Sequence, residues 1–371
     1  MDPRPAIENL CCLNPECKAY SQRGHDNLTL RKTYGADRIR YLRCRTCGEE
    51  FSERKGTALF NCKIQEAKAV SIMEHLDSHC GTNATARLVG VSKDAVRRLV
   101  GVNGRVSSQL QDRLIRHLRP TALQFDEKWS YVGKKQAHMT RDDDPRERGD
   151  YWDANGLDPQ SKLLVSLVPG KRTAETIHQV VAEAAERLAP DGEQPAIFTD
   201  GEPAYVDAIL DVFGHRYPVA RRRPRGRPPA PVVRVPQDLV SAQVIKHRHG
   251  GRVRQVEIRP IFGKGRLPAV VAKLGWNKVN TSAIERFNLT DRMRNARKGR
   301  KTIGFSRRTC FHDAMSWISA LRYNFHHAHR ALRQQTEEGR WQQRTPAMAA
   351  GVANHLYSSL ELMRLCPIGL R

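Results

Sequence analysis

Near Leu123 the pattern of apolar and polar positions changes from one typical of helices to one typical of strands. The stretches 121–135, 150–156 and 162–170 predict three successive strands. Residues 173–189 then have apolar positions at helical spacing. Residues 195–200 form an apolar run that ends in an acid, and 202–213 predict a second helix. The predicted order is therefore strand, strand, strand, helix, strand, helix.

The pattern before this region predicts two smaller structures. Residues 28–33 and 38–44 alternate as in a β-hairpin that turns at 34–37. Farther on, a helical pattern at 64–79 is followed by a short helix ending at Val89, a turn at Gly90, Ser92 as N-cap and another helix. This spacing predicts a helix-turn-helix, although short helical hairpins also occur as mere packing units.

These patterns predict a multidomain α+β protein. Its parts would be a small hairpin module at 1–60, a helix-turn-helix domain at 61–120 and an RNase-H-like α/β domain at 121–371 with C-terminal helices. We expect an insertion at about 218–266, made of a Pro- and Arg-rich loop at 221–233 and a cationic hairpin that turns at Gly250 and Gly251.

The charge of the chain predicts the kind of partner that it binds. The 371 residues contain 63 Lys and Arg against 39 Asp and Glu, which gives a net charge of +24. A generic basic surface is one explanation, but the cations are clustered, which favours binding of a polyanion such as double-stranded DNA. The sequence has no run of 18 apolar residues and no signal-peptide pattern, so we expect a cytoplasmic, nucleoid-associated protein without a membrane partner.

Nine cysteines include two close-spaced pairs, Cys12 with Cys17 and Cys44 with Cys47. Pairs that flank a hairpin are typical of a zinc ribbon, so we expect one structural Zn²⁺. Cys11 could replace Cys12 as a ligand. The alternative is that these residues are ordinary buried thiols.

Three acidic stretches in the cationic chain predict a second metal site. Asp126 lies in the first predicted strand, Asp200 ends the fourth, and Glu285 lies on a later helix. In an RNase-H-like sheet those two strands are neighbours, so the acids would meet and could hold two Mg²⁺ or Mn²⁺ ions about 4 Å apart for phosphoryl transfer. Glu127 and Glu202 are alternative ligands, and each acid taken alone could be a capping or ion-paired carboxylate.

Basic residues follow Glu285 along its helix. Arg292 lies two turns farther on, on the same face, where it could contact a phosphate or a DNA end. The predicted DNA-binding residues on the two basic helices are Lys93, Arg97, Arg98, Arg286, Arg292, Arg294, Arg297, Lys298, Arg300 and Lys301.

The stretches DEKWSYVGKK, TDGEPAY and ERFNLTDRMRNARKGRKTIGFSRRTCFHDAM, in this order, resemble the DDE transposases of the insertion-sequence-one type. The resemblance implies that Asp126, Asp200 and Glu285 are a metal-binding triad and that Arg292 is the basic residue seven positions after the glutamate. His312 falls at a histidine of the pattern, although a capping or core role explains it equally well. The 84 residues between Asp200 and Glu285 exceed those of compact family members.

The implied activity is cleavage at the ends of a mobile element, followed by attack of the freed 3′ hydroxyls on target DNA. Joining two ends requires at least two protomers, so a homodimer or larger assembly is expected. Two other functions fit the pattern less well. One is an RNase-H-like nuclease or resolvase, and the other is a domesticated transposase that acts as a DNA-binding regulator.

Overall fold

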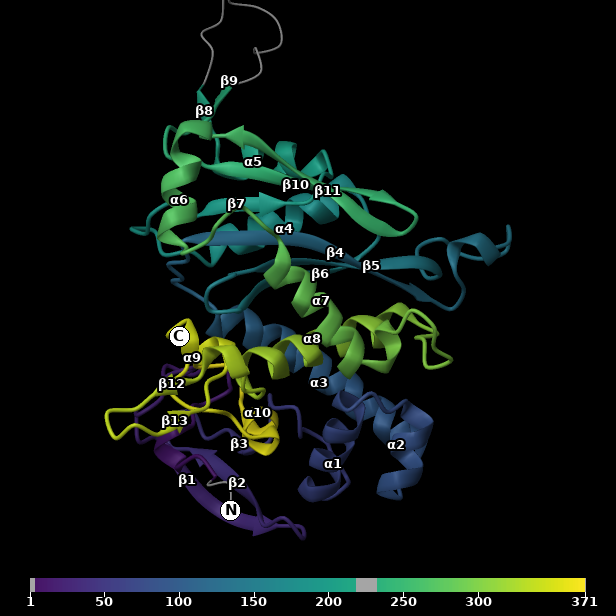
Figure 1. Ribbon diagram of the computed structural model, residues 1–371. Coiled ribbons are helices and arrows are strands. Elements are labelled where there is room, and N and C mark those ends of the chain that lie inside the picture. Colours follow the sequence, from purple (N-terminus) through teal and green to yellow (C-terminus); the bar gives the residue numbers. More distant parts are fainter. Residues whose placement is uncertain (1–3, 218–231, 371) are drawn as a thin grey trace, which may run out of the picture. The chain divides into compact units, whose positions relative to one another are not determined.

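The computed structural model describes residues 4–217 and 232–370. Contacts divide the chain into two compact units (Figure 1). One unit consists of Met1–Ile115, Ser130–Asp150 and Thr290–Arg371, and the other of Arg116–Trp129 and Tyr151–Leu289. Each unit is described by itself.

The first unit begins with a small antiparallel sheet in the order β1-β2-β3. Its strands are β1 (Leu28–Tyr34), β2 (Ile39–Cys44) and β3 (Glu50–Ser52). The β1–β2 register pairs Leu28 with Cys44 and Tyr34 with Ile39, which confirms the predicted hairpin. Gly35 takes a left-handed φ of 68° in the turn, a conformation that glycine adopts without strain.

Three helices follow: α1 (Glu66–Asp77), α2 (Thr82–Val89) and α3 (Lys93–Leu114). As predicted, α2 ends at a left-handed Gly90, and the Ser92 hydroxyl caps α3 by accepting a hydrogen bond from the Ala95 N–H at 3.1 Å. The helix continues well past Arg98. At Gly104 it packs so closely on α8 (Thr309–Phe325) that an added Cβ would lie 2.4 Å from the Ala314 Cβ.

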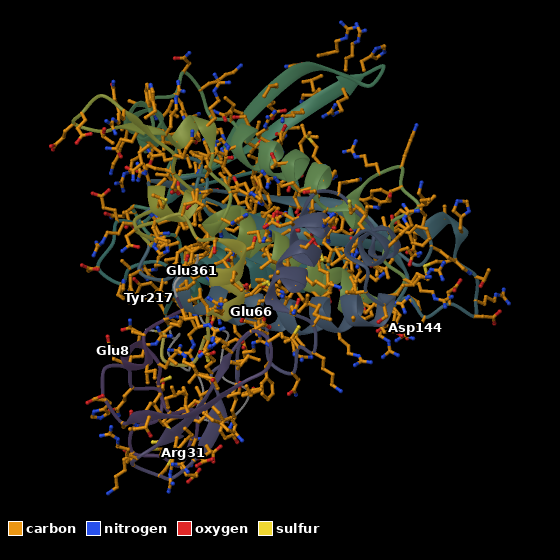
Figure 2. The ribbon with its side chains drawn as sticks, turned by 90° about the horizontal axis from the view of Figure 1, so that it is seen from below. Glu8, Arg31, Glu66, Asp144, Tyr217 and Glu361 are labelled. Atoms are coloured by element: carbon orange, nitrogen blue, oxygen red, sulfur yellow. The ribbon has the colours of Figure 1, made fainter. Side chains whose placement is uncertain are left out.

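The C-terminal part of this unit is mainly helical. Its elements are α8 (Thr309–Phe325), the two-residue strands β12 (Gln334–Gln335) and β13 (Trp341–Gln342), α9 (Pro346–Ala349) and α10 (Ser359–Arg364). Ion pairs join it to α1. The buried Asp77 carboxylate accepts from Arg322 at 2.9 Å, and Glu66, labelled in Figure 2, pairs with Arg364 at 2.6 Å.

The second unit is built on a six-stranded mixed sheet in the order β11-β10-β7-β4-β5-β6. The pairs β4–β7 and β7–β10 are parallel, whereas β10–β11 and β5–β6 are antiparallel. The strands are β4 (Ala122–Val132), β5 (Gly149–Leu157), β6 (Leu164–Gly170), β7 (Ala196–Thr199), β10 (Ser241–His249) and β11 (Arg252–Phe262). The predicted order along the chain, strand, strand, strand, helix, strand, helix, is confirmed.

Helices cover both faces of this sheet because its strands are apolar on both sides. The helices are α4 (Ala174–Glu186), α5 (Ala204–Phe213), α6 (Leu267–Lys273) and α7 (Ser282–Arg294), the last of which ends in the first unit. On one face, Ala122 and Phe198 share a core with Leu267 of α6. On the other, Phe125 meets Tyr205 of α5 with 6.0 Å between ring centres.

The predicted cationic hairpin corresponds to β10 and β11, with Gly250 and Gly251 in left-handed conformations at its turn. The predicted Pro- and Arg-rich loop at 221–233 lies outside the described residues except for 232 and 233. Those two residues begin β9 (Val232–Arg234), which pairs with β8 (His215–Tyr217). None of the described helices is long and apolar enough to cross a membrane.

Candidate metal centres and nucleic-acid interface

Three carboxylates gather where β7 ends beside β4. The parallel register pairs Phe125 with Thr199, so Asp126 and Asp200 are the next residues on two neighbouring strands. The carboxylate oxygens of Asp126, Glu127 and Asp200 all lie within 4.8 Å of one another. The predicted meeting of the two aspartates, which are far apart in sequence, is therefore observed.

Asp126 and Glu127 approach the cluster from opposite faces of the sheet, because successive strand residues alternate. Gln124 and Asp126 point to the α7 side, where the Gln124 side chain accepts from the Ile284 N–H at 3.0 Å and Asn288 donates to Asp126 at 2.9 Å. Glu127 points to the α5 side with Phe125. Its carboxylate still comes within 4.8 Å of both aspartate carboxylates.

Burial and mutual repulsion make the cluster costly without a cation. Burial, followed by the charges of Asp200, Glu127 and Glu285, raises the pKa of Asp126 from 3.8 to about 7. Burial and the charge of Asp200 also raise the pKa of Glu127 to about 7, although Arg172 opposes this shift. Burial raises the pKa of Asp200 as well. Three hard oxygen donors so arranged suit a divalent cation such as Mg²⁺.

Arg172 is the fixed cation beside this cluster. Its guanidinium pairs with Glu127 at 3.3 Å and with Glu202 at 2.7 Å, and it stacks on the Trp152 ring at 5.3 Å. Glu202, the other alternative ligand, is thus bound to an arginine and does not belong to the group of three. The charge of Arg172 partly offsets the repulsion between the acids.

Glu285 lies near the cluster but outside the group of three. Its exposed carboxylate accepts hydrogen bonds from Lys246 of β10 and, at 2.6 Å, from Thr281. Its charge contributes to the raised pKa of Asp126 and of Asp200. A cation that recruited Glu285 would have to compete with the Lys246 ion pair.

Asn288 is a site residue that the sequence pattern did not predict. It lies one turn after Glu285 and donates to Asp126, while its own oxygen accepts from Asn155 at 3.1 Å. The spacing of three residues on one helix was the signal that could have identified it. Arg172 and Lys246 offered no such local signal, because only the folded sheet brings them to the acids.

The predicted basic residues after Glu285 have different environments. Arg286, Arg300 and Lys301 are exposed, whereas Arg292, Arg294 and Arg297 are half-buried. Lys298 differs from the prediction of an exposed track. It is fully buried, and its ammonium lies 2.6 Å from Nε2 of His312, which also contacts Ser130 at 3.0 Å. His312 itself is buried in α8, with its ring turned into the first unit.

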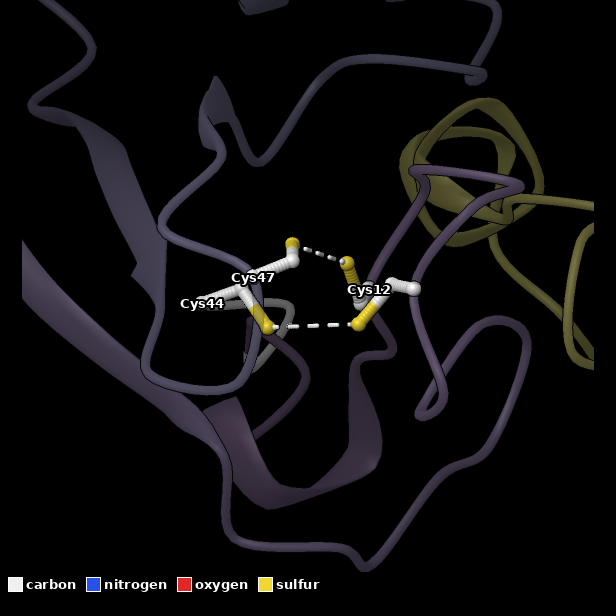
Figure 3. Close-up of side chains that lie close together, drawn as sticks. Cys12, Cys44 and Cys47 are labelled. Carbon is white, nitrogen blue, oxygen red and sulfur yellow. Dashed lines mark hydrogen bonds between the residues drawn. The ribbon is translucent and has the colours of Figure 1, made fainter.

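The four predicted zinc ligands form a separate cluster in the first unit. The sulfur atoms of Cys12, Cys17, Cys44 and Cys47 lie within 4.8 Å of one another, with Cys12–Cys47 at 3.7 Å and Cys17–Cys44 at 3.8 Å (Figure 3). Four sulfurs bound tetrahedrally to zinc at about 2.3 Å are about 3.8 Å apart, so the cluster fits Zn²⁺.

The residues around the sulfurs favour Cys12 over Cys11 as a member of the cluster. The Cys11 thiol points away from the cluster and lies 3.5 Å from the Ile368 carbonyl. The Asn27 side chain donates to the Cys44 sulfur at 3.1 Å, and the Ala19 N–H donates to that of Cys17 at 3.4 Å. Such N–H donors stabilise thiolate ligands.

Lys93, Arg97 and Arg98 lie exposed on the first two turns of α3. Arg97 forms an ion pair with Asp94 at 3.0 Å, three residues before it on the same helix. Pairs of this exposed type are weak and can be exchanged for a phosphate contact.

The chain has only weak similarity to known proteins. No protein-family model and no curated protein matches the chain. Among solved structures, a Mos1 strand transfer complex and a pre-cleavage Mos1 transpososome are similar to it at 11% identity and a TM-score of 0.19, over 70% of this chain and 77% of theirs. A likeness of that size carries no argument about function. The fold and sites define a multidomain mixed α/β protein with a four-cysteine cluster and a buried acidic cluster.

Proposed function

We propose that this chain is a DDE-type transposase of an insertion sequence. It would bind the terminal repeats of its element, cleave at the ends and join the 3′ hydroxyls to target DNA. The observation that carries the proposal is the convergence of Asp126 and Asp200 on adjacent parallel strands, in a chain of net charge +24. Acids collected inside a cationic protein need a function, and metal-dependent chemistry on a polyanion supplies one.

In this proposal Asp126, Asp200 and Glu285 are the ligands of the catalytic cations. Bound Mg²⁺ ions would activate the attacking oxygen and stabilise the leaving oxygen of a phosphodiester. Asn288 orients Asp126 through its hydrogen bond at 2.9 Å, and Arg172 keeps Glu127 and Glu202 in place. Glu127 has the geometry of a further ligand, since its carboxylate belongs to the group of three.

The proposed domains are a zinc ribbon at 1–60, a helix-turn-helix at 61–120 and an RNase-H-like catalytic domain at 121–371. The four-cysteine cluster supports the ribbon. The Gly90 turn and the cap at Ser92 support the helix-turn-helix, in which Arg97 and Arg98 would contact end DNA. The parallel β4–β7–β10 core with antiparallel neighbours supports the catalytic domain. Arg292 would hold the DNA end, and two or more protomers would join two ends.

The test uses DNA that flanks the gene, where terminal inverted repeats are expected. Purified protein would be incubated with labelled end fragments, Mg²⁺ and a plasmid target, and cleaved and joined products would be separated on a gel. Asp126→Asn, Asp200→Asn and Glu285→Gln should each lose cleavage and joining by at least 100-fold while they keep end binding. Asp207→Asn, an exposed acid on α5, is the matched control and should stay active.

The other outcomes separate the rival functions. Cleavage without any joining would support the nuclease, and end binding without cleavage in the parent protein would support the regulator. Glu127→Gln and Glu202→Gln should be tested beside the triad. Parental cleavage in Glu285→Gln with loss in Glu127→Gln would replace Glu285 by Glu127 as the third ligand.

A further inference from the structure

A large basic groove lies within the first unit, away from the cysteine cluster. One wall comes from α2 and the first half of α3, and the other from residues 295–317. Its volume is about 1860 Å³, whereas pockets for small molecules measure about 300–1,000 Å³. The groove therefore has room for a stretch of polymer.

The cations of this groove come from elements far apart in sequence. Arg97, Arg98 and Arg105 lie on α3, and Arg297, Arg307 and Arg308 lie on the opposite wall. The only acids that line it among the described residues are Asp94 and Asp313. Such an excess of positive charge, built from two separate walls, indicates a polyanionic occupant.

Most of this charge is uncompensated in the described structure. The guanidinium groups of Arg98, Arg105, Arg307 and Arg308 have no ion pair or hydrogen bond to any described residue. Arg297 donates to the Thr82 hydroxyl at 3.1 Å, and burial together with the nearby Arg97 charge lowers its pKa to about 10. Two guanidiniums that repel each other across a groove are stabilised when an anion lies between them.

Aromatic side chains line the same groove between the arginines. Phe60 is 40% exposed, and Phe305, Phe311 and Trp317 are partly exposed. Ile303, on the same wall as Arg307, is 100% exposed. Basic grooves with partly exposed aromatic rings are typical of proteins that bind single strands, because unpaired bases can stack on the rings. In a duplex the base faces are already stacked on one another and cannot reach the rings.

We propose that this groove binds a single strand of DNA, with its phosphates on the arginines and its bases against Phe60, Phe311 and Trp317. Such a site would hold a strand separated from its partner. It shares Arg97 and Arg98 with the duplex contacts of the proposed helix-turn-helix, whereas Arg307, Arg308 and the aromatic rings belong to the groove alone. It does not depend on the acidic cluster or on any cleavage step.

The test measures binding of a fluorescent oligo-dT strand to the full chain by anisotropy at several salt concentrations, without divalent cations. Arg307→Ala/Arg308→Ala should weaken single-strand binding at least ten-fold. It should also lower the slope of log affinity against log salt by about 1.4, since each lost contact on a single strand contributes about 0.7. Arg333→Ala/Arg340→Ala removes two exposed charges of the same unit that lie outside the groove, and should change binding less than three-fold.

The aromatic contribution needs its own variant. Phe311→Leu should weaken single-strand binding about 5- to 100-fold with an unchanged salt slope, whereas Phe311→Tyr, which keeps a ring, should bind as the parent does. A duplex of the same length distinguishes the two forms of DNA. Equal losses on duplex and single strand would overturn the proposal in favour of a duplex site. Parental binding by the Arg307/Arg308 variant would overturn it altogether. Loss of end cleavage in Asp126→Asn has no bearing on either result.

Discussion

Asp126→Asn should make the metal-free protein more stable above pH 7, by about 2–4 kcal/mol. The pKa of Asp126 is raised from 3.8 to about 7 in the folded state. That difference corresponds to about 4 kcal/mol of unfavourable free energy for the ionised carboxylate, at about 1.4 kcal/mol for each pKa unit. Asparagine has nearly the same shape and cannot ionise, but it keeps part of the burial cost of a polar group. The expected gain is therefore about 2–4 kcal/mol.

The pH dependence has a definite sign. Between pH 4 and pH 7 the folded protein holds a proton on Asp126 that the unfolded chain has already lost. The free energy of unfolding of the parent therefore falls as the pH rises through this window, and the whole penalty is present above pH 7. The variant lacks this term, so its advantage should grow from near zero at pH 4 to its full value at about pH 8.

The assay is urea denaturation at pH 4.5, 6 and 8 in EDTA, followed by tryptophan fluorescence. Asp207→Asn controls for the loss of an exposed acid from the same unit. Adding Mg²⁺ at pH 8 should stabilise the parent more than the variant, because the parent keeps the ligand. A stability difference between parent and variant that is the same at all three pH values would refute the reasoning, because it would mean that the pKa of Asp126 is not raised in the folded protein.

Three further changes test other parts of the fold. Cys44→Ser should lose the single zinc found by elemental analysis and unfold the N-terminal sheet, whereas Cys11→Ser should keep the metal because its thiol faces Ile368; a zinc-free parent would contradict this. Gly104→Ala should lower the free energy of unfolding by about 1–3 kcal/mol through its clash with Ala314, whereas Gly101→Ala, which meets nothing within 4 Å, should raise it by about 0.5–1 kcal/mol. Arg322→Leu should lower the free energy of unfolding by about 3–5 kcal/mol, because it leaves Asp77 buried without this partner. Arg340→Leu, whose pair with Glu338 is exposed, should lower it by less than about 1 kcal/mol. Equal losses of unfolding free energy in the two variants would refute this ranking.

Local patterns predicted the elements of this chain well. The hairpin around Gly35, the N-cap at Ser92 and the order of strands and helices from 122 to 213 follow from side-chain periodicity and turn chemistry alone. The adjacency of β4 and β7 followed from element order, and it brought Asp126 to Asp200. Each of these features depends on residues close in sequence or on a topology that few alternatives could satisfy.

The features that could not be predicted from the sequence depend on contacts between residues that lie far apart along the chain. The extent of α3 past Gly101 and Gly104 is one of them, because glycine usually disfavours a helix interior. The close approach of Ala314 accounts for Gly104 but not for Gly101. The burial of Lys298 is another. A lysine in a run of cations is expected to face water, but the packing of α8 places His312 beside its ammonium. Arg172, which follows β6, pairs with Glu127 of β4 although β5 lies between these two strands in the sheet.

The core beneath the cysteine cluster has an unusual order of assembly. Cys366 and Ile368 pack against the apolar cluster of the first residues, and the Cys366 thiol lies where a Cβ at Gly56 would be only 2.8 Å away. Ribosomal synthesis delivers residues 12–47 more than 300 residues before this closing segment. The nascent chain can therefore gather its four thiolates early, but the apolar side of that module stays open to solvent until residues 366–368 have been synthesised. Removal of residues 366–368 should thus first destabilise the distant module that contains Cys11 to Phe51.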